Sequence, residues 1–194
     1  MPMFDFRGIR CGKFNEGADG SISYTDHCSI GEAMNCSLQL RFAEGRLYAE
    51  SSLAEYLRKA TGGTISIGVK YIPDKAQALM FGAKTMERTV NTKKVSGLVY
   101  SAADKGNYMG VSFYAPDMID GEEKYTCVFV MKARFGLPGW NFATMGENFT
   151  FQTPTTTGEF LTKDKEGKAL VEVAVCDDEE TAIAWTKLVL GEAA

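Results

Sequence analysis

The chain has 194 residues, of which 45% are hydrophobic and 24% charged, and its formal net charge is −4. This composition predicts one globular domain over residues 1–194 and excludes a largely disordered chain. The net negative charge argues against a surface that grips nucleic acid, and no apolar run is long enough to cross a bilayer. Five widely scattered cysteines are typical of reduced thiols in a cytoplasmic protein.

The first 30 residues predict strands or an N-terminal arm. Residues 4–14 indicate an opening strand or arm, and residues 15–21 are rich in Gly and short polar side chains, as loops are. A short strand follows over residues 21–25. Residues 37–44 then alternate apolar and polar side chains with period two, which predicts a half-buried strand.

Two readings stay open for the next segment. Glu44-Gly45 predicts a turn, after which residues 45–61 form either a hairpin partner or an extended arm. Residues 51–60 fit a short helix equally well, with Ser51 or Ser52 as its cap. The run Thr61-Gly62-Gly63 predicts a break in the chain.

Residues 64–72 alternate cleanly, and a helix is expected directly after them. Pro73 suits the first turn of a helix, where its missing N–H costs nothing. Gly82 fits the end of that helix. Short strands are expected over residues 85–90, 95–102 and 108–116, with a basic turn at 91–94, a hairpin turn at 104–107 and a loop at 117–123.

Residues 124–161 carry the expected structural spine of an antiparallel β domain. Residues 125–135 are apolar on both faces in their middle, as in a strand that is covered on both sides. A Gly-Leu-Pro-Gly corner follows at 136–139. Four aromatic residues then alternate with other residues, and we interpret them as sandwich core rather than as a platform for stacking bases: Trp140, Phe142, Phe149 and Phe151.

A hairpin turn at 164–167, a strand at 169–175 and a closing helix complete the prediction. Asp177 suits the N-cap of this helix, since three further acidic residues follow in its first turn. Gly191 ends the helix, and its apolar stripe comprises Ala182, Trp185, Leu188 and Val189. Together, these expected strands and helices predict a mainly β fold, a sandwich or barrel, with two short helices packed on the sheets.

The sequence contains no pattern that favours catalysis or a cofactor. His27 is the only histidine, and Cys11, Cys28 and Cys36 around it lack the close spacing of zinc ligands. No serine lies in a Gly-x-Ser-x-Gly motif, and the glycines do not precede a helix as a phosphate-binding loop would. We therefore expect no enzyme activity, no metal and no cofactor.

Several stretches together resemble the major tail proteins, also called tail tube proteins, of long-tailed, non-contractile bacteriophages and prophages. They stand in the order expected of that family: LYAESSL (47–53), GGTISIGVKYIPDKAQALMFGAK (62–84), the paired strands near 107–115 and 123–138, and NFTFQTPTTTGEF (148–160). The similarity spans roughly residues 30–192, and the order and spacing of the set carry it.

The resemblance implies a tail tube-like fold and a structural role. Members of this family form hexameric rings that stack into a hollow tube, through which viral DNA leaves the capsid without specific binding. The implied partners are other copies of the chain and other tail proteins, namely the tape measure, tail tip and tail terminator. The implied location is the tail of the virion, assembled in the host cytoplasm, and no membrane is involved.

Two sets of residues follow from this reading. Small polar residues opposite an apolar strand face are candidates for the lumen side: Gln39, Arg41, Glu44, Thr64, Ser66 and Gly68. The segment 45–61 is the candidate arm between subunits, with Leu47, Tyr48, Ser51, Ser52, Leu53 and Tyr56. The alternatives are a soluble β-barrel module that binds a small molecule and the inner-tube protein of a contractile injection system.

Overall fold

The computed structural model describes residues 5–140, 142, 144, 153–163 and 168–192. Ten strands and two helices lie within these residues, in the following order: β1 (Arg7–Glu16), β2 (Ile22–Ser29), β3 (Ala33–Ala49), β4 (Ser52–Val69), α1 (Asp74–Phe81), β5 (Lys84–Val90), β6 (Lys93–Val99), β7 (Tyr108–Ile119), β8 (Glu122–Phe135), β9 (Thr155–Phe160), β10 (Val171–Cys176) and α2 (Glu179–Leu188).

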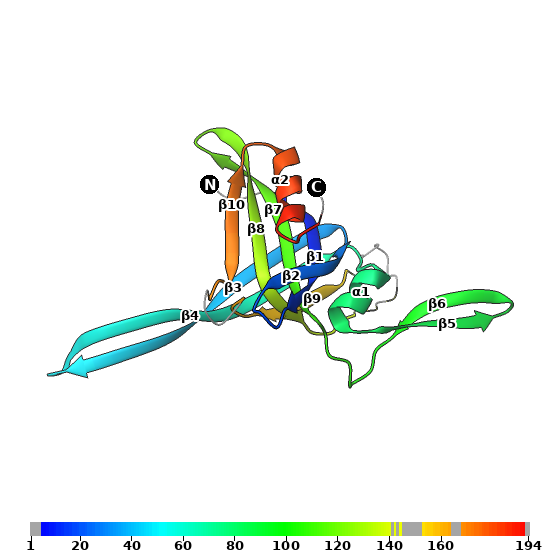
Figure 1. The fold of residues 1–194 in the computed structure, drawn as a ribbon, viewed down its shortest axis with the longest axis horizontal. Helices are drawn as coiled ribbons and strands as arrows, with labels where there is room; N and C mark the ends of the chain where they lie inside the picture. Colours follow the sequence, from blue (N-terminus) through cyan, green and yellow to red (C-terminus); the bar gives the residue numbers. More distant parts are fainter. Residues whose placement is uncertain (1–4, 141, 143, 145–152, 164–167, 193–194) are drawn as a thin grey trace.

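Eight of these strands form one antiparallel sheet in the order β2-β1-β7-β8-β9-β4-β3, with β10 paired to β8. Strand β8 lies at its centre: β7 runs along one edge, while β10 and β9 share the other. β10 pairs with residues 125–130 and β9 with residues 133–135. The sheet therefore divides into two wings, with β7, β8 and β10 upright in Figure 1 and β3 and β4 running across them.

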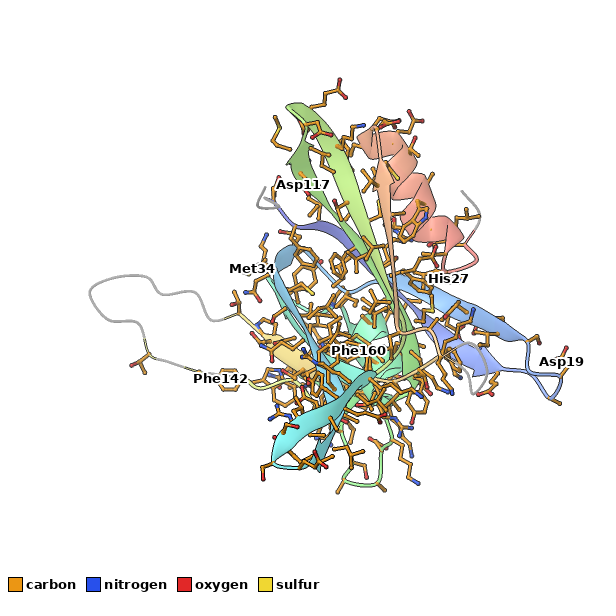
Figure 2. All side chains as sticks on the ribbon, turned by 90° about the vertical axis from the view of Figure 1, so that its left-hand side faces the viewer. Asp19, His27, Met34, Asp117, Phe142 and Phe160 are labelled. Carbon is orange, nitrogen blue, oxygen red and sulfur yellow. The ribbon has the colours of Figure 1, made fainter. Side chains whose placement is uncertain are left out.

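The core lies between the two wings. Fully buried side chains from both wings belong to one cluster, among them Ile9 and Val130 from one wing and Ile65 and Phe160 from the other. Figure 2 shows Phe160 in the middle of this packing. Burying an aliphatic or aromatic side chain of this size stabilises a fold by about 1.5–3 kcal/mol, so these contacts hold the wings together.

Each helix covers a different part of the sheet. Helix α1 places Ala76, Met80 and Phe81 in the core between the wings, and it ends at Gly82, whose φ is +74° and whose N–H donates to Ala78 O. Helix α2 packs on the outer face of β7 and β8, where Ala182 contacts the cluster around Cys127. The predicted mainly β fold with two helices packed on the sheets is confirmed, and the N-terminal 30 residues contribute strands β1 and β2 to the main sheet.

The predicted turn at Gly45, the alternative helix at 51–60 and the predicted break at 61–63 are wrong. Strand β3 runs past Gly45 to Ala49, and the hairpin turns at Glu50 and Ser51, which both have positive φ. Thr61 is instead an extra residue in the ladder, a β-bulge, because Arg41 pairs with Gly62 and Phe42 with Ala60. The glycines here accommodate a close approach of Phe160 rather than ending the strand.

Two smaller predictions are also corrected. The expected loop at 117–123 is a tight hairpin, because β7 continues to Ile119 and the turn needs only Asp120 and Gly121, both at positive φ. The N-cap of α2 is Asp178 rather than Asp177, since the Asp178 carboxylate accepts a hydrogen bond from the Thr181 N–H at 2.7 Å. Leu188, expected in the apolar stripe of α2, is 68% exposed. The turn predicted at 164–167 lies outside the described residues.

Candidate functional site

One face of the β3–β4–β9 wing is polar from strand to strand. Residues paired across an antiparallel ladder share a face, so the register places polar residues in continuous rows. One row joins Ser37, Ser66 and Thr157, and the next joins Gln39, Thr64 and Glu159. Five of the six predicted lumen residues lie on this face: Gln39, Arg41, Thr64, Ser66 and Gly68.

Two side-chain contacts cross this polar face. Arg41 Nη2 donates to Glu159 Oε1 at 2.8 Å, and Thr157 Oγ1 donates to Ser66 Oγ at 3.3 Å. The Arg41 and Glu159 side chains are 56% and 65% exposed, so water screens their attraction and the pair contributes little to stability. These contacts link β3, β4 and β9 into one solvent-exposed surface with few unpaired charges.

Glu44 does not belong to the polar face. It is three residues from Arg41 on a continuous strand, and side chains alternate between faces with period two. On the opposite face, the Glu44 carboxylate lies 3.3 Å from Arg58 Nε and 3.5 Å from Arg46 Nη2. The prediction that Glu44 shares a face with Gln39 and Arg41 is wrong. It grouped the three residues because they are polar, although only residues an even number of positions apart share a face.

The polar face ends at a free strand edge. Strand β3 has 17 residues and pairs with β4, and no other strand in the described part of the chain lies along its outer side. Its outward backbone N–H and C=O groups are therefore available to pair with another strand. An exposed edge of this length is a template for association with another chain.

The outer part of β3 and β4 forms a long hairpin arm, residues 42–60, that projects away from the body (Figure 1). Its residues 42–59 are all exposed. From the end of the sheet to the turn the arm has about nine residues a strand, or about 30 Å. The structure places every predicted arm residue on it: Leu47, Tyr48, Ser51, Ser52, Leu53 and Tyr56.

One face of the arm is braced by its own side chains. The Arg58 guanidinium lies 3.8 Å from the ring centre of Phe42, and that of Arg46 lies 5.6 Å from the ring centre of Tyr56. Glu44 ion-pairs with both arginines. Cation–π contacts at exposed sites contribute about 0.5–1 kcal/mol each, so this ladder stiffens an element that has no support from the core.

The apolar side chains of the arm remain open to solvent. Leu57 is 72% exposed, Tyr48 62%, Leu47 58% and Leu53 52%. The arm therefore presents a concentration of exposed large apolar side chains.

A second hairpin, β5–β6, projects on the other side of the body (Figure 1). The sequence predicted its two strands but gave no indication that they leave the sheet. It makes a separate two-stranded sheet whose valines Val90, Val95 and Val99 are 53%, 48% and 45% exposed. Projecting elements therefore extend from two sides of the molecule.

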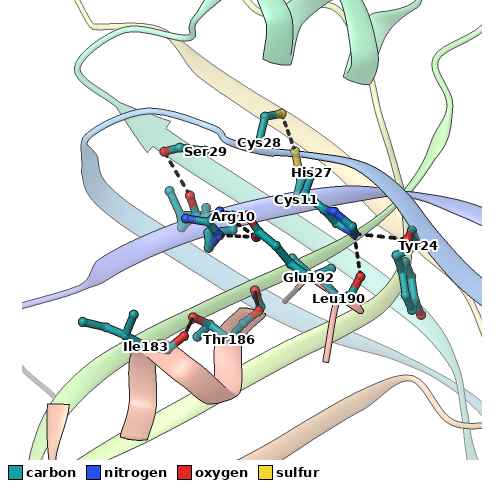
Figure 3. A network of polar contacts seen from close by, with 12 residues as sticks. Arg10, Cys11, Tyr24, His27, Cys28, Ser29, Ile183, Thr186, Leu190 and Glu192 are labelled. Atoms are coloured by element: carbon teal, nitrogen blue, oxygen red, sulfur yellow. Dashed lines mark hydrogen bonds and ion pairs between the residues drawn. The ribbon is translucent and has the colours of Figure 1, made fainter. Parts of the chain in front are cut away.

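His27 and the cysteines around it are structural (Figure 3). His27 Nε2 lies 2.6 Å from Leu190 O and 3.1 Å from Tyr24 O, which ties the end of α2 to β2. Cys11 and Cys28 are cross-strand partners with sulfurs 3.4 Å apart, and their hydrogen bond raises the pKa of Cys11 and lowers that of Cys28. The described residues contain no cluster of three or more metal-ligating side chains.

Of the four aromatic residues expected in the core, the two that the structure describes, Trp140 and Phe142, lie outside it. Trp140 is 49% exposed and stacks edge-on against Tyr100, while Phe142 is 92% exposed and lies at the outer margin in Figure 2. The prediction failed for these two residues because alternation along the chain does not by itself decide whether other segments cover the side chains. Phe149 and Phe151 lie outside the described residues.

Two hollows open to solvent lie on the surface. One, of about 510 Å³, lies at the base of the long hairpin arm and is lined by Lys59, Tyr108 and Lys132 among others. The other, of about 550 Å³, lies beside α1, between Asp74 and Asn107. In the wall of the first hollow, Lys132 Nζ lies 3.6 Å from the Glu16 carboxylate.

Comparison with known proteins gave no family for this chain: no protein-family model matches it, and no curated protein matches its sequence. Neither helix in the described part of the chain has the length and apolar character needed to span a bilayer.

Proposed function

We propose that this chain is the structural subunit of a phage tail tube, which assembles with copies of itself into stacked hexameric rings. The observation that carries this proposal is the polar face of β3, β4 and β9, which ends at the free edge of β3. Pairing of that edge with a neighbouring copy would continue the sheet from subunit to subunit. A closed ring satisfies the exposed backbone groups of every copy at once.

The chemistry of the polar face suits a conduit for DNA. Most of its rows contain Ser, Thr, Asn, Gln or Gly, and Arg41 is neutralised by Glu159. Protein groups hold DNA chiefly through lysines and arginines that neutralise phosphates. A hydrated face with few free cations, on a chain of net charge −4, would let DNA pass without binding it.

The long hairpin arm supplies the contact between subunits in this proposal. Its exposed leucines and tyrosines would be buried against a neighbouring subunit or ring. Other tail proteins, namely the tape measure, tail tip and tail terminator, would meet the tube inside or at its ends. The protein would then act in the virion tail, after assembly in the host cytoplasm and without a membrane or a cofactor.

Electron microscopy of the purified protein, over a series of concentrations, tests the proposal. Rings or tubes with an open channel are the expected result. A species that stays strictly monomeric at high concentration and binds a small molecule in a closed apolar pocket would support a soluble binding module instead. Tubes that form only inside a sheath of a second protein would indicate the inner tube of a contractile injection system.

Deletion of the long hairpin arm gives a second test. Replacing residues 42–60 by a two-residue turn removes only exposed residues and the half-buried Ala60, so the shortened protein should still fold and unfold cooperatively in urea. Tube growth should be lost. Normal tubes from the shortened protein would contradict the role of the arm.

A further inference from the structure

The β5–β6 hairpin carries two faces of different character. The register places Arg88 opposite Val95 and Val90 opposite Lys93, so these four residues share one face with Lys84 and Val99. We call this the apolar–basic face. The only acidic residue of the hairpin, Glu87, lies on the other face, where its carboxylate is 3.9 Å from Lys94 Nζ.

The apolar–basic face has no partner among the residues that the structure describes. Its three valines are 45% to 53% exposed and its cations have no acidic neighbour on that face. A two-stranded hairpin without further packing is marginally stable in water. Exposed valines together with uncompensated cations therefore fit a surface that is both apolar and acidic.

Such a surface is present on the same chain, at strand β10. Val173 and Val175 are 60% and 54% exposed, whereas their partners on β8, Val128 and Thr126, are 7% and 5% exposed, so the exposure belongs to the edge strand. The outer backbone edge of β10 is also unpaired within the described part of the chain. We call these two valines, together with the nearby carboxylates of Asp117, Glu122 and Asp177, the β10 surface.

The β10 surface has more negative than positive charge. Lys124 lies on the face of Val173 and Val175, and it is 3.1 Å from Asp177 and 3.8 Å from Glu122. A third carboxylate, Asp117, is in register with Lys124, is only 9% exposed and has an Oδ1 atom without a hydrogen-bond donor. Two carboxylates thus pair with one lysine while a third lies on the neighbouring strand, and an additional cation would offset the remaining charge.

We propose that the apolar–basic face of β5–β6 docks on the β10 surface of a second copy of this chain. The valines of the two surfaces would pack together, and Arg88 and Lys93 would lie near the carboxylates of the β10 surface. This inference rests on the proposed self-assembly and names a second contact between copies, distinct from the long hairpin arm. Charge complementarity of this kind fixes the register and orientation of partners more than it adds affinity.

Charge reversal tests the contact in solution. The variant Arg88→Glu with Lys93→Glu should slow tube growth at least tenfold, as followed by light scattering, while its circular dichroism spectrum stays unchanged. The matched control is Lys94→Glu, which reverses a charge on the other face of the same hairpin and should leave growth within twofold. Adding Glu122→Lys and Asp177→Lys to the double variant should restore growth. Equal growth of the double variant and the wild type would overturn the inference.

A cross-linking experiment separates this inference from the proposed function. A zero-length reagent that joins lysines to carboxylates is applied to an equal mixture of ¹⁴N- and ¹⁵N-labelled wild-type protein at assembly concentration. Mixed-isotope links from Lys84 or Lys93 to Glu122 or Asp177 are the expected result. Rings or tubes without such links would overturn the docking contact and leave the tube proposal standing. Such links in small oligomers that never close into rings would support the docking contact and contradict the tube proposal.

Discussion

Arg41 and Glu159 form an ion pair across strand β4, although they are 118 residues apart in the sequence. Arg41 lies on β3 and Glu159 on β9, and Gly62, the β4 residue opposite Arg41, has no side chain to stand between them. The pair shows that three strands from distant parts of the chain present one surface.

Arg41→Gln should change the free energy of unfolding by less than about 1 kcal/mol, because both side chains are more than half exposed. Urea unfolding of the wild type, Arg41→Gln, Glu159→Gln and the double variant measures the coupling directly. A coupling above 2 kcal/mol would mean that the pair is part of the framework of the fold, contrary to its assignment to a hydrated surface.

Gly63→Ala should destabilise the protein by about 1–3 kcal/mol. An added Cβ would lie 2.2 Å from Gln39 O and 2.3 Å from the Phe160 ring, so either the ladder or the core must shift. Gly45→Ala is the matched control on the same hairpin, since nothing lies within 4 Å of its added Cβ. Chemical denaturation measures the stability of both variants. Equal losses of stability would contradict the close approach at Gly63.

Asp178→Ala should lower the thermal midpoint by roughly 2–4 °C. The Asp178 carboxylate accepts hydrogen bonds from both the N–H and the hydroxyl of Thr181, and these contacts lower its pKa. A depressed carboxyl pKa means that this stabilisation is lost as the pH falls through the folded-state pKa. Asp177→Ala, next to it, caps nothing and should leave the midpoint within 1 °C; calorimetry compares the two.

Alkaline pH should weaken the fold partly through Cys36. Burial raises the pKa of this thiol from 9.0 to about 12. The unfolded chain therefore loses the proton first as the pH rises above 9, and stability falls until about pH 12. Near pH 10 the loss from this group is about 1 kcal/mol relative to pH 7. Urea unfolding at both pH values should show a shallower decline for Cys36→Ala; an identical decline would exclude the effect.

Leu57→Asp should block assembly without weakening the monomer. Leu57 is 72% exposed and pairs with Gly45 in the half of the long hairpin arm nearer the body. Its replacement should therefore cost the monomer little, while a carboxylate would oppose burial against a neighbour. Light scattering and electron microscopy follow assembly, and urea unfolding checks the monomer. Glu50→Gln, at the turn of the same arm, is the control that should assemble normally.

The sequence by itself determined the local elements. Period-two alternation at residues 64–70, the apolar middle of β8 and the Pro73 and Gly82 boundaries of α1 predicted these elements because backbone geometry sets side-chain direction within a few residues. The mainly β fold class followed from the same patterns. Five of the six residues predicted to share a polar strand face do share one, since alternation alone separates the polar side of a strand from its core side.

Only the tertiary structure decided where strands continue and what they face. The pair Gly62-Gly63 is compatible with a loop and with a bulged strand. The close approach of Phe160, nearly 100 residues later in the sequence, favours the bulged strand. The exposure of Phe142 and the projection of β5–β6 likewise depend on packing between distant segments. Side-chain alternation is a property of neighbouring residues, whereas burial and strand pairing are settled by contacts that the local pattern does not encode.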